Sequence, residues 1–260
     1  HMMYKADAFN NYDTIICNGK YQMKEIRKYE AKNKLRKKNL VSASYNRIER
    51  IIFEYENYFK DNESSEGTKT LLIAPSWGED NLIESIGENL IKLLLENNYE
   101  VILRPHPEML KRKPNSIKYL NEKFSTYSKY KLDTKHESND SMIIADLLIC
   151  DCSGIALEYS FGTKRPVLFF DVPVKIKNKS YKELDIEPFE LSTRSIIGEI
   201  VDPYDLNHSL KIISKLLEET NQYSQIIDDL IKQNLFLDNQ STSNEAKFIA
   251  NYINSPQDKT

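Results

Sequence analysis

Short apolar runs alternate with amphipathic segments through the middle of this 260-residue chain, and the alternation limits the folds open to it. Runs of four or five residues suit strands that are covered on both faces. Such strands are expected at residues 70–74, 99–103, 147–150 and 166–170. Helical spacing marks the segments between them, at residues 82–95, 116–124, 141–145 and 153–161. This order predicts βαβ units, so we expect residues 69–220 to form an α/β domain with a Rossmann-like, doubly wound parallel sheet.

The ends of the chain are expected to form separate parts, residues 1–60 and 221–260. The polar stretch 61–68 contains helix and strand breakers and is the best internal boundary. Before it, the sequence predicts strands at 13–17 and 39–43, a helix at 20–31, and a helical apolar stripe from Tyr45. Residues 171–200 are expected to be irregular. The final helices are expected at 203–219, 222–236 and 243–253.

Glycine is scarce, with 7 residues in 260, and no glycine-rich phosphate loop is present. Neither G-x-x-x-x-G-K-[ST] nor G-x-G-x-x-G occurs, so the sequence excludes a Walker-type NTPase and an ordinary dinucleotide binder. The three cysteines, Cys17, Cys150 and Cys152, lack the spacing of a disulfide framework or a zinc knuckle, and no H-E-x-x-H occurs. We therefore expect no metal site.

Ligands of doubly wound sheets bind outside the carboxyl ends of the strands, where three polar segments are expected here. The first contains Ser76 and Trp77, the only tryptophan of the chain, which could also be packed in a turn. The second is Arg104-Pro-His106-Pro. Its prolines fix the backbone around the imidazole, and its guanidinium is a planar fork suited to phosphate. A structural histidine is the alternative.

The third segment, Asp151-Cys152-Ser153-Gly154, leads into a helix that carries Glu158. Ser153 is a good N-cap residue, and Gly154 would let a ligand approach the first turn closely. The free N–H groups of a helix start bind anions without a glycine-rich loop. The sequence therefore predicts a nucleotide-diphosphate site here, with Glu158 toward the ribose, although ordinary capping stays an alternative.

Asn139 and Ser141 are expected to cap the short helix before the third strand. Their loop would lie near a base bound at the same edge of the sheet. Capping alone would also explain both residues.

Charge is unevenly distributed along the chain. Residues 1–60 contain 13 Lys/Arg and 7 Asp/Glu, whereas the whole chain has a net charge of -3. A basic run over residues 20–38 is either a solvated surface or a face toward anionic lipid or an anionic polymer. No nucleic-acid recognition motif accompanies it. The apolar stretches are much shorter than the roughly 20 residues that span a bilayer.

Taken together, the motifs resemble the CDP-glycerol glycerophosphotransferase family, the teichoic-acid and capsule polymerases of the GT-B fold. The resemblance covers roughly residues 12–205. It rests on the order and spacing of the segments 74–78, 104–107, 145–163 and 165–171, and continues through Pro173-Val-Lys175, Glu187-Pro188 and Arg194. The resemblance implies that residues 69–220 are the nucleotide-donor domain, and that residues 1–60 are the remnant of an acceptor-side Rossmann-like domain.

The family implies a reaction in which an acceptor hydroxyl attacks the β-phosphate of CDP-glycerol and CMP leaves, with no required cofactor. By motif, Ser153 and Gly154 would hold the diphosphate, Glu158 the ribose, and Arg104 and His106 the phosphates. The acceptor would be an anionic cell-surface polymer, reached from the cytoplasmic face of the membrane, with peripheral contact through residues 20–38.

One feature of the family is missing from this sequence. Its first domain has a His-Gly motif that supplies the base for the acceptor, and no His-Gly occurs here. We therefore expect the donor-binding part of a longer polymerase. The rivals are a GT-B glycosyltransferase or epimerase that uses another nucleotide sugar, and a non-catalytic module that binds polymer or membrane.

Overall fold

The computed structural model describes residues 2, 4, 7–61, 67–237 and 239–254. Two compact units are present, and each is discontinuous in sequence. Unit 1 comprises residues 1–49, 176–189 and 229–260, and unit 2 comprises residues 50–175 and 190–228. The domain boundaries expected from the sequence stay a prediction, and residues 62–66 of the expected boundary lie outside the described part.

Unit 2 contains a six-stranded sheet in which every strand pairs in parallel with its neighbours. The strand order is β5-β4-β3-β6-β7-β8. Numbered from β3, this is the order 3-2-1-4-5-6 of the doubly wound nucleotide-binding fold. The strands are β3 (Thr70–Ile73), β4 (Glu100–Leu103), β5 (Tyr130–Leu132), β6 (Leu147–Cys150), β7 (Val167–Phe170) and β8 (Gly198–Val201). The predicted α/β fold with a parallel, doubly wound sheet is confirmed.

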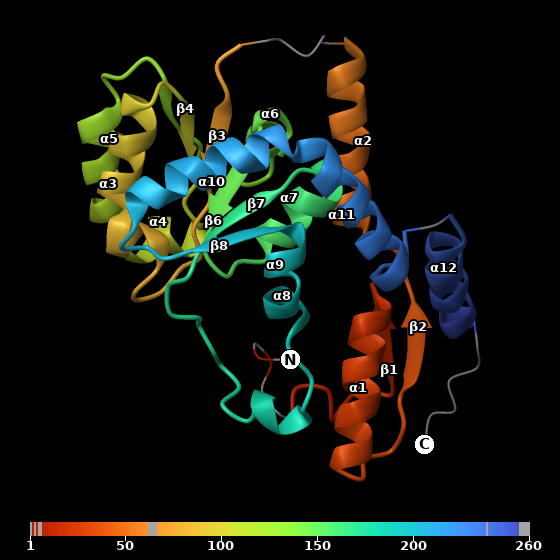
Figure 1. Cartoon of the computed structure of the whole chain (residues 1–260). Coiled ribbons are helices and arrows are strands. Elements are labelled where there is room, and N and C mark those ends of the chain that lie inside the picture. Colours follow the sequence, from red (N-terminus) through yellow and green to blue (C-terminus); the bar gives the residue numbers. More distant parts are fainter. Residues whose placement is uncertain (1, 3, 5–6, 62–66, 238, 255–260) are drawn as a thin grey trace. The chain divides into compact units, whose positions relative to one another are not determined.

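Helices pack on both faces of this sheet (Figure 1), as crossover connections between parallel strands require. The helices of unit 2 are α3 (Leu82–Glu96), α4 (Pro107–Arg112), α5 (Pro114–Phe124), α6 (Asp140–Ile144), α7 (Ile155–Thr163), α9 (Arg194–Ile197) and α10 (Leu206–Glu218). All four residues of β3, β6 and β7 are buried, because helices cover both sides. The central strands therefore carry the continuous apolar sequences from which they were predicted.

Unit 1 is built around a second, two-stranded parallel sheet, β1 (Thr14–Cys17) and β2 (Asn39–Ser42). The helix α1 (Lys20–Lys32) connects these strands, and α12 (Asn239–Asn254) contacts β2. A stacked pair of rings, Tyr21 and Phe189, ties residues 176–189 to α1, with ring centroids 4.1 Å apart. The remaining helices α2 (Asn46–Asp61), α8 (Phe189–Ser192) and α11 (Thr220–Asn234) have residues in both units.

Membrane-spanning helices are not found in the part of the chain that the structure describes. No helix there is both long enough and apolar enough to cross a bilayer.

Candidate active site

The carboxyl ends of β3 and β6 lie side by side where the sheet reverses its strand order, and one carboxylate joins them. Asp151 is fully buried and accepts hydrogen bonds from the backbone N–H and hydroxyl of Ser76, at 2.7 and 3.0 Å, and from the N–H of Leu82 at 3.1 Å. Burial raises the pKa of Asp151, although these hydrogen bonds oppose the shift. Asp151 thus links the ends of these two strands, at the edge of the sheet where such folds bind their ligands.

His106 stands at the end of β4 and begins α4. Its Nδ1 accepts a hydrogen bond from the Glu108 N–H at 3.1 Å, so the neutral imidazole carries its proton on Nε2. Burial lowers the pKa of His106 from its ordinary value of about 6.5; the positive charge of Lys175 acts in the same direction, and Glu108 opposes it. A neutral imidazole with a fixed tautomer is suited to donate a hydrogen bond from Nε2.

Trp77 lies beside His106, with ring centroids 6.0 Å apart. Two cations also contact its indole ring. The Lys175 ammonium is 2.8 Å from the ring centroid, and the Arg112 guanidinium carbon is 5.2 Å away. The following residue, Gly78, has φ of +131°, a backbone conformation that only glycine adopts without strain. Trp77 was predicted from the sequence as a site residue, whereas Lys175 was not.

The side chain of Arg104 turns into the protein. It is 4% exposed and forms an ion pair with Asp133 at 2.9 Å. Its N–H groups also donate to the Ser141 hydroxyl and to the carbonyls of His136 and Ser138. These partners hold the loop after β5, so the structure gives Arg104 a positioning role rather than the phosphate contact expected for it.

The start of α7 differs from the expected N-cap at Ser153. The cap position is Gly154, and the helix begins at Ile155. Gly154 has an ordinary right-handed helical conformation, φ -60° and ψ -25°, and an added Cβ would have no atom within 4 Å. Neither its backbone conformation nor its protein neighbours require a glycine here. The open space leaves room for a ligand at the helix start.

Cys152 precedes the start of α7 and Glu158 lies in its first turn, and both side chains are partly buried. Burial raises the pKa of the Cys152 thiol to about 11, so the thiol stays protonated at neutral pH. Arg194 lies near Cys152 and bonds Asp171 at 2.9 Å, but its Nε and Nη1 atoms are buried without a partner among the described residues.

Asn139 and Ser141 lie in the loop before β6 as expected, but they do not cap α6 with their side chains. The Asn139 amide donates to the Glu54 carboxylate at 2.8 Å, and its carbonyl oxygen is buried without a partner in the described chain. Ser141 is held by Arg104. Capping is therefore wrong for these side chains, and contact with a nucleotide base stays a prediction.

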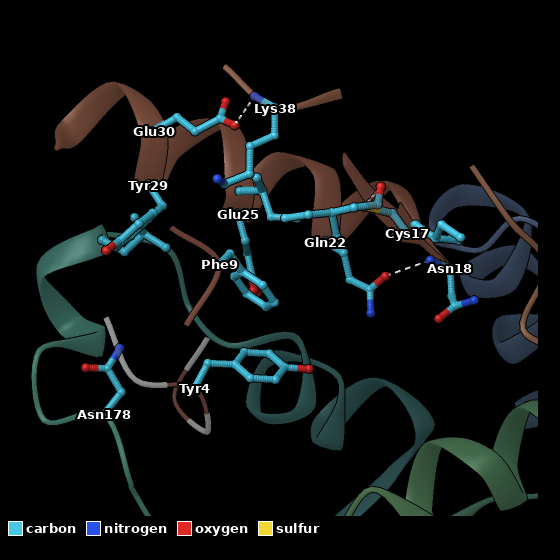
Figure 2. Close-up of a pocket in the computed structure, with 14 residues that line it drawn as sticks. Tyr4, Phe9, Cys17, Asn18, Gln22, Glu25, Tyr29, Glu30, Lys38 and Asn178 are labelled. Atoms are coloured by element: carbon cyan, nitrogen blue, oxygen red, sulfur yellow. Dashed lines mark hydrogen bonds between the residues drawn. The ribbon is translucent and has the colours of Figure 1, made fainter. Parts of the chain in front are cut away.

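A separate cavity of about 260 Å³ lies in unit 1, and no residue predicted for donor binding lines it. Figure 2 shows the rings of Tyr4, Phe9 and Tyr29 around it, together with the carboxylate of Glu25. Burial raises the pKa of Glu25. Glu30, which is 2% exposed, accepts the Lys38 N–H at 2.8 Å and closes one end. Sequence reasoning missed this cavity, because its lining residues form no motif.

The family model described as CDP-Glycerol:Poly(glycerophosphate) glycerophosphotransferase matches residues 19–190. No match was found among curated proteins.

Two solved structures are similar to the chain at the level of the fold. A variant of the wall teichoic acid polymerase TagF, with CDPG, has a TM-score of 0.57 and 21% identity over 95% of this chain. An α,α-trehalose-phosphate synthase (UDP-forming) from Burkholderia vietnamiensis has a TM-score of 0.52 and 10% identity over 96% of this chain and 62% of its own. The chain spans 59% of the length of the TagF structure.

Proposed function

Because the chain belongs to the CDP-glycerol:poly(glycerophosphate) glycerophosphotransferase family, we propose that it binds CDP-glycerol at the carboxyl ends of β3, β4 and β6. The bound donor would give up its glycerol phosphate to a polymer acceptor, with release of CMP. One observation carries the proposal: the open space beside Gly154 at the start of α7. There, free N–H groups and the positive end of the helix dipole favour a diphosphate.

The neighbouring residues have matching roles in this proposal. Ser153 lies next to the diphosphate, and Glu158, one turn into α7, meets the ribose. The acceptor hydroxyl releases its proton to the solution as its oxygen forms a bond to the β-phosphorus, while the bond from that phosphorus to the CMP oxygen breaks. His106 donates its Nε2–H to an oxygen of the departing phosphate, where negative charge develops. Most of the rate enhancement of phosphoryl transfer comes from positioning and electrostatics, which these groups supply.

Calorimetric titration of the full chain with CDP-glycerol tests the donor site. The most informative variant is Gly154→Ala. Its added methyl group has no protein atom within 4 Å, so the thermal unfolding temperature should stay unchanged. We expect it to weaken CDP-glycerol binding at least tenfold, since the methyl group occupies the space of the diphosphate. Ser153→Ala should weaken binding less.

The matched control is Gly87→Ala on α3. The nearest atoms to its added Cβ belong to Ile83, from 3.0 to 3.4 Å away, and the position lies within α3, so this substitution should leave affinity unchanged. Wild-type protein that binds neither CDP-glycerol nor CDP contradicts the proposal. A preference for UDP or GDP over CDP favours a transferase for another nucleotide sugar.

We further propose that the acceptor is an anionic cell-surface polymer, of teichoic-acid or capsule type, reached at the inner face of the membrane. The basic run on α1 and the turn after it supports this proposal, because it supplies charge complementary to such a polymer or to anionic lipid.

A further inference from the structure

The cavity of unit 1 has no role in the proposed function. It measures about 260 Å³, and every residue that lines it belongs to unit 1. Protein interiors contain few voids larger than a water molecule, because unfilled space loses the contacts between packed atoms. Hollows with mostly apolar walls and a few polar groups are typical of sites for small ligands. The cavity is therefore a candidate site apart from the donor site, whose residues lie in unit 2.

The cavity follows one face of α1. Gln22, Ile26 and Glu30 line it, and residues four apart lie on the same side of a helix. From Gln22 to Glu30 the helix rises about 12 Å, at 1.5 Å per residue. Ile15 of β1 and Leu184 add further apolar wall. A cavity that is long and apolar in this way fits a straight hydrocarbon chain.

Aromatic rings form another part of the wall. The rings of Tyr4, Phe9 and Tyr29 surround the cavity in Figure 2, and those of Tyr4 and Phe9 meet edge to face, with centroids 5.2 Å apart. Burial of a hydrocarbon chain against such rings removes apolar surface from water, which is favourable. This part of the wall therefore suits the chain of a ligand rather than its polar end.

Lys38 brings a positive charge to the end of the cavity that Glu30 closes. Its backbone N–H donates to the Glu30 carboxylate at 2.8 Å, and Lys38 itself lines the cavity. Its ammonium donates to the Tyr12 carbonyl at 2.7 Å and forms no ion pair with a carboxylate in the described part of the chain. A carbonyl does not cancel the charge, and two further N–H donors of the ammonium are left for a ligand.

The acidic side chains of the wall do not oppose an anion at this end. Glu30 already uses both carboxylate oxygens, one for the Arg27 guanidinium at 2.7 Å and the other for the Lys38 N–H. Glu25 lies more than one turn away along α1, and burial raises its pKa, which favours the neutral carboxyl. The charge offered to a ligand at the Glu30 end is therefore that of Lys38.

We infer that this cavity binds a single-chain lipid with an anionic head group, its chain along α1 and its head at the Lys38 ammonium. The apolar walls and the cation at one end match the two parts of such a molecule. The contact at the head is a charge-assisted hydrogen bond from Nζ to an oxygen of the ligand. A carboxylate and a phosphate monoester both meet this requirement. The inference goes beyond the donor site and does not depend on it.

The experiment is a calorimetric titration of the full chain with ten-carbon probes that differ only in the head group. They are decanoate, decyl phosphate, decanol and decyltrimethylammonium, each kept below the concentration at which it forms micelles. We expect the two anions to bind at least tenfold more tightly than decanol, and the cation to bind more weakly than decanol. Whichever anion binds more tightly assigns the head group as a carboxylate or a phosphate, and either order supports the inference.

Lysine variants test the head-group contact. Lys38→Met should weaken decanoate and decyl phosphate binding about tenfold and leave decanol within twofold, because only the charged contact is lost. Lys38→Arg keeps the charge and should stay within threefold of wild type. The matched control is Lys37→Met, which removes the neighbouring charge. Lys37 is exposed and does not line the cavity, so every affinity should stay within twofold.

Ile26→Phe tests the site of the chain. Its larger side chain occupies part of the cavity and should weaken all four probes at least tenfold, while thermal unfolding shows whether the variant is folded. The lysine variants keep the inference testable if it is not.

Four results would overturn the inference. They are a wild type that binds none of the probes, equal affinities for the anionic, neutral and cationic heads, equal losses in Lys38→Met and Lys37→Met, and a folded Ile26→Phe protein that binds decanoate like wild type.

Discussion

His106 caps the start of α4 with Nδ1 and is proposed to donate a hydrogen bond to the ligand from Nε2. Both roles depend on which ring nitrogen carries the proton. Nδ1 must be unprotonated to accept the Glu108 N–H, and that bond leaves the proton on Nε2 for a ligand. The flanking prolines were a sound sequence signal for a fixed imidazole. The protonation state could not be predicted, because it depends on burial and on Lys175, which is distant in the sequence.

Replacement of His106 should separate the structural duty from the chemical one. His106→Ala removes the side-chain cap of α4 and should cost about 1 kcal/mol in the free energy of unfolding. His106→Asn supplies another good cap and should unfold like wild type above pH 7, as denaturant titration would show. Both variants should bind CDP-glycerol more weakly. Equal stability of the two variants would contradict the capping role.

The pH dependence of stability gives a second test of His106. The folded-state pKa lies below the ordinary value, so the folded protein binds fewer protons than the unfolded chain. The stability contributed by the neutral imidazole is therefore complete above pH 6.5, and it decreases as the pH falls toward the folded-state pKa. His106→Asn should flatten this dependence between pH 7 and pH 5. If the free energy of unfolding of His106→Asn depends on pH as steeply as that of wild type, the lowered pKa of His106 is contradicted.

At the scale of elements, the sequence predicted the buried strands well and the edge strands poorly. The runs that became β3, β4, β6 and β7 are apolar because helices cover both faces. The edge strands β5 and β8 were missed, because YKL and GEIV are short and β8 lies partly in a segment expected to be irregular. The short helices α4, α8 and α9 were missed for the same reason: four to six residues carry no full periodicity.

Arg104 shows why site residues are harder to predict than elements. The sequence correctly placed Arg104 at the end of β4. The direction of its side chain, however, is set by Asp133, which lies 29 residues further along the chain. Burial alone would raise the pKa of Asp133. Hydrogen bonds from Ser141 and the Lys135 N–H, together with the charge of Arg104, lower it. No local pattern in the sequence contains that partnership.

Arg104→Met should therefore act on the loop between β5 and α6 rather than directly on the donor. It leaves the Asp133 carboxylate without its cation and two backbone carbonyls without a donor. Breaking a buried pair in this way costs about 3 kcal/mol or more in the free energy of unfolding. Addition of Asp133→Asn should recover part of this loss in denaturant titrations. A single variant as stable as wild type would contradict the positioning role.

Some positive charges of the basic run of residues 20–38 are already paired with carboxylates of the same unit. Fewer of them are therefore available to an anionic partner than the composition of the run suggests. Lys28 pairs with Asp185 at 3.2 Å, and Lys32 pairs with Glu183 at 3.2 Å. The side chains of Lys24, Lys34 and Lys37 are exposed and form no ion pair within the described residues. A polyanion or an anionic bilayer would therefore meet a small cluster of lysines at α1 and the turn after it.

Vesicle sedimentation tests this cluster as a peripheral membrane contact. With anionic phosphatidylserine vesicles, binding should decrease as salt rises from 50 to 300 mM, because surface charges are screened. A triple variant that combines Lys24→Gln, Lys34→Gln and Lys37→Gln should weaken binding about 100-fold, since each lysine near an anionic surface contributes about 1 kcal/mol.

The double variant Lys28→Gln and Lys32→Gln is the control. Its charges are already paired within unit 1, so its effect should be several times smaller. If both variants lose the same vesicle affinity, net charge alone drives association. If wild type binds neither vesicles nor a soluble polyanion, α1 is a solvated helix.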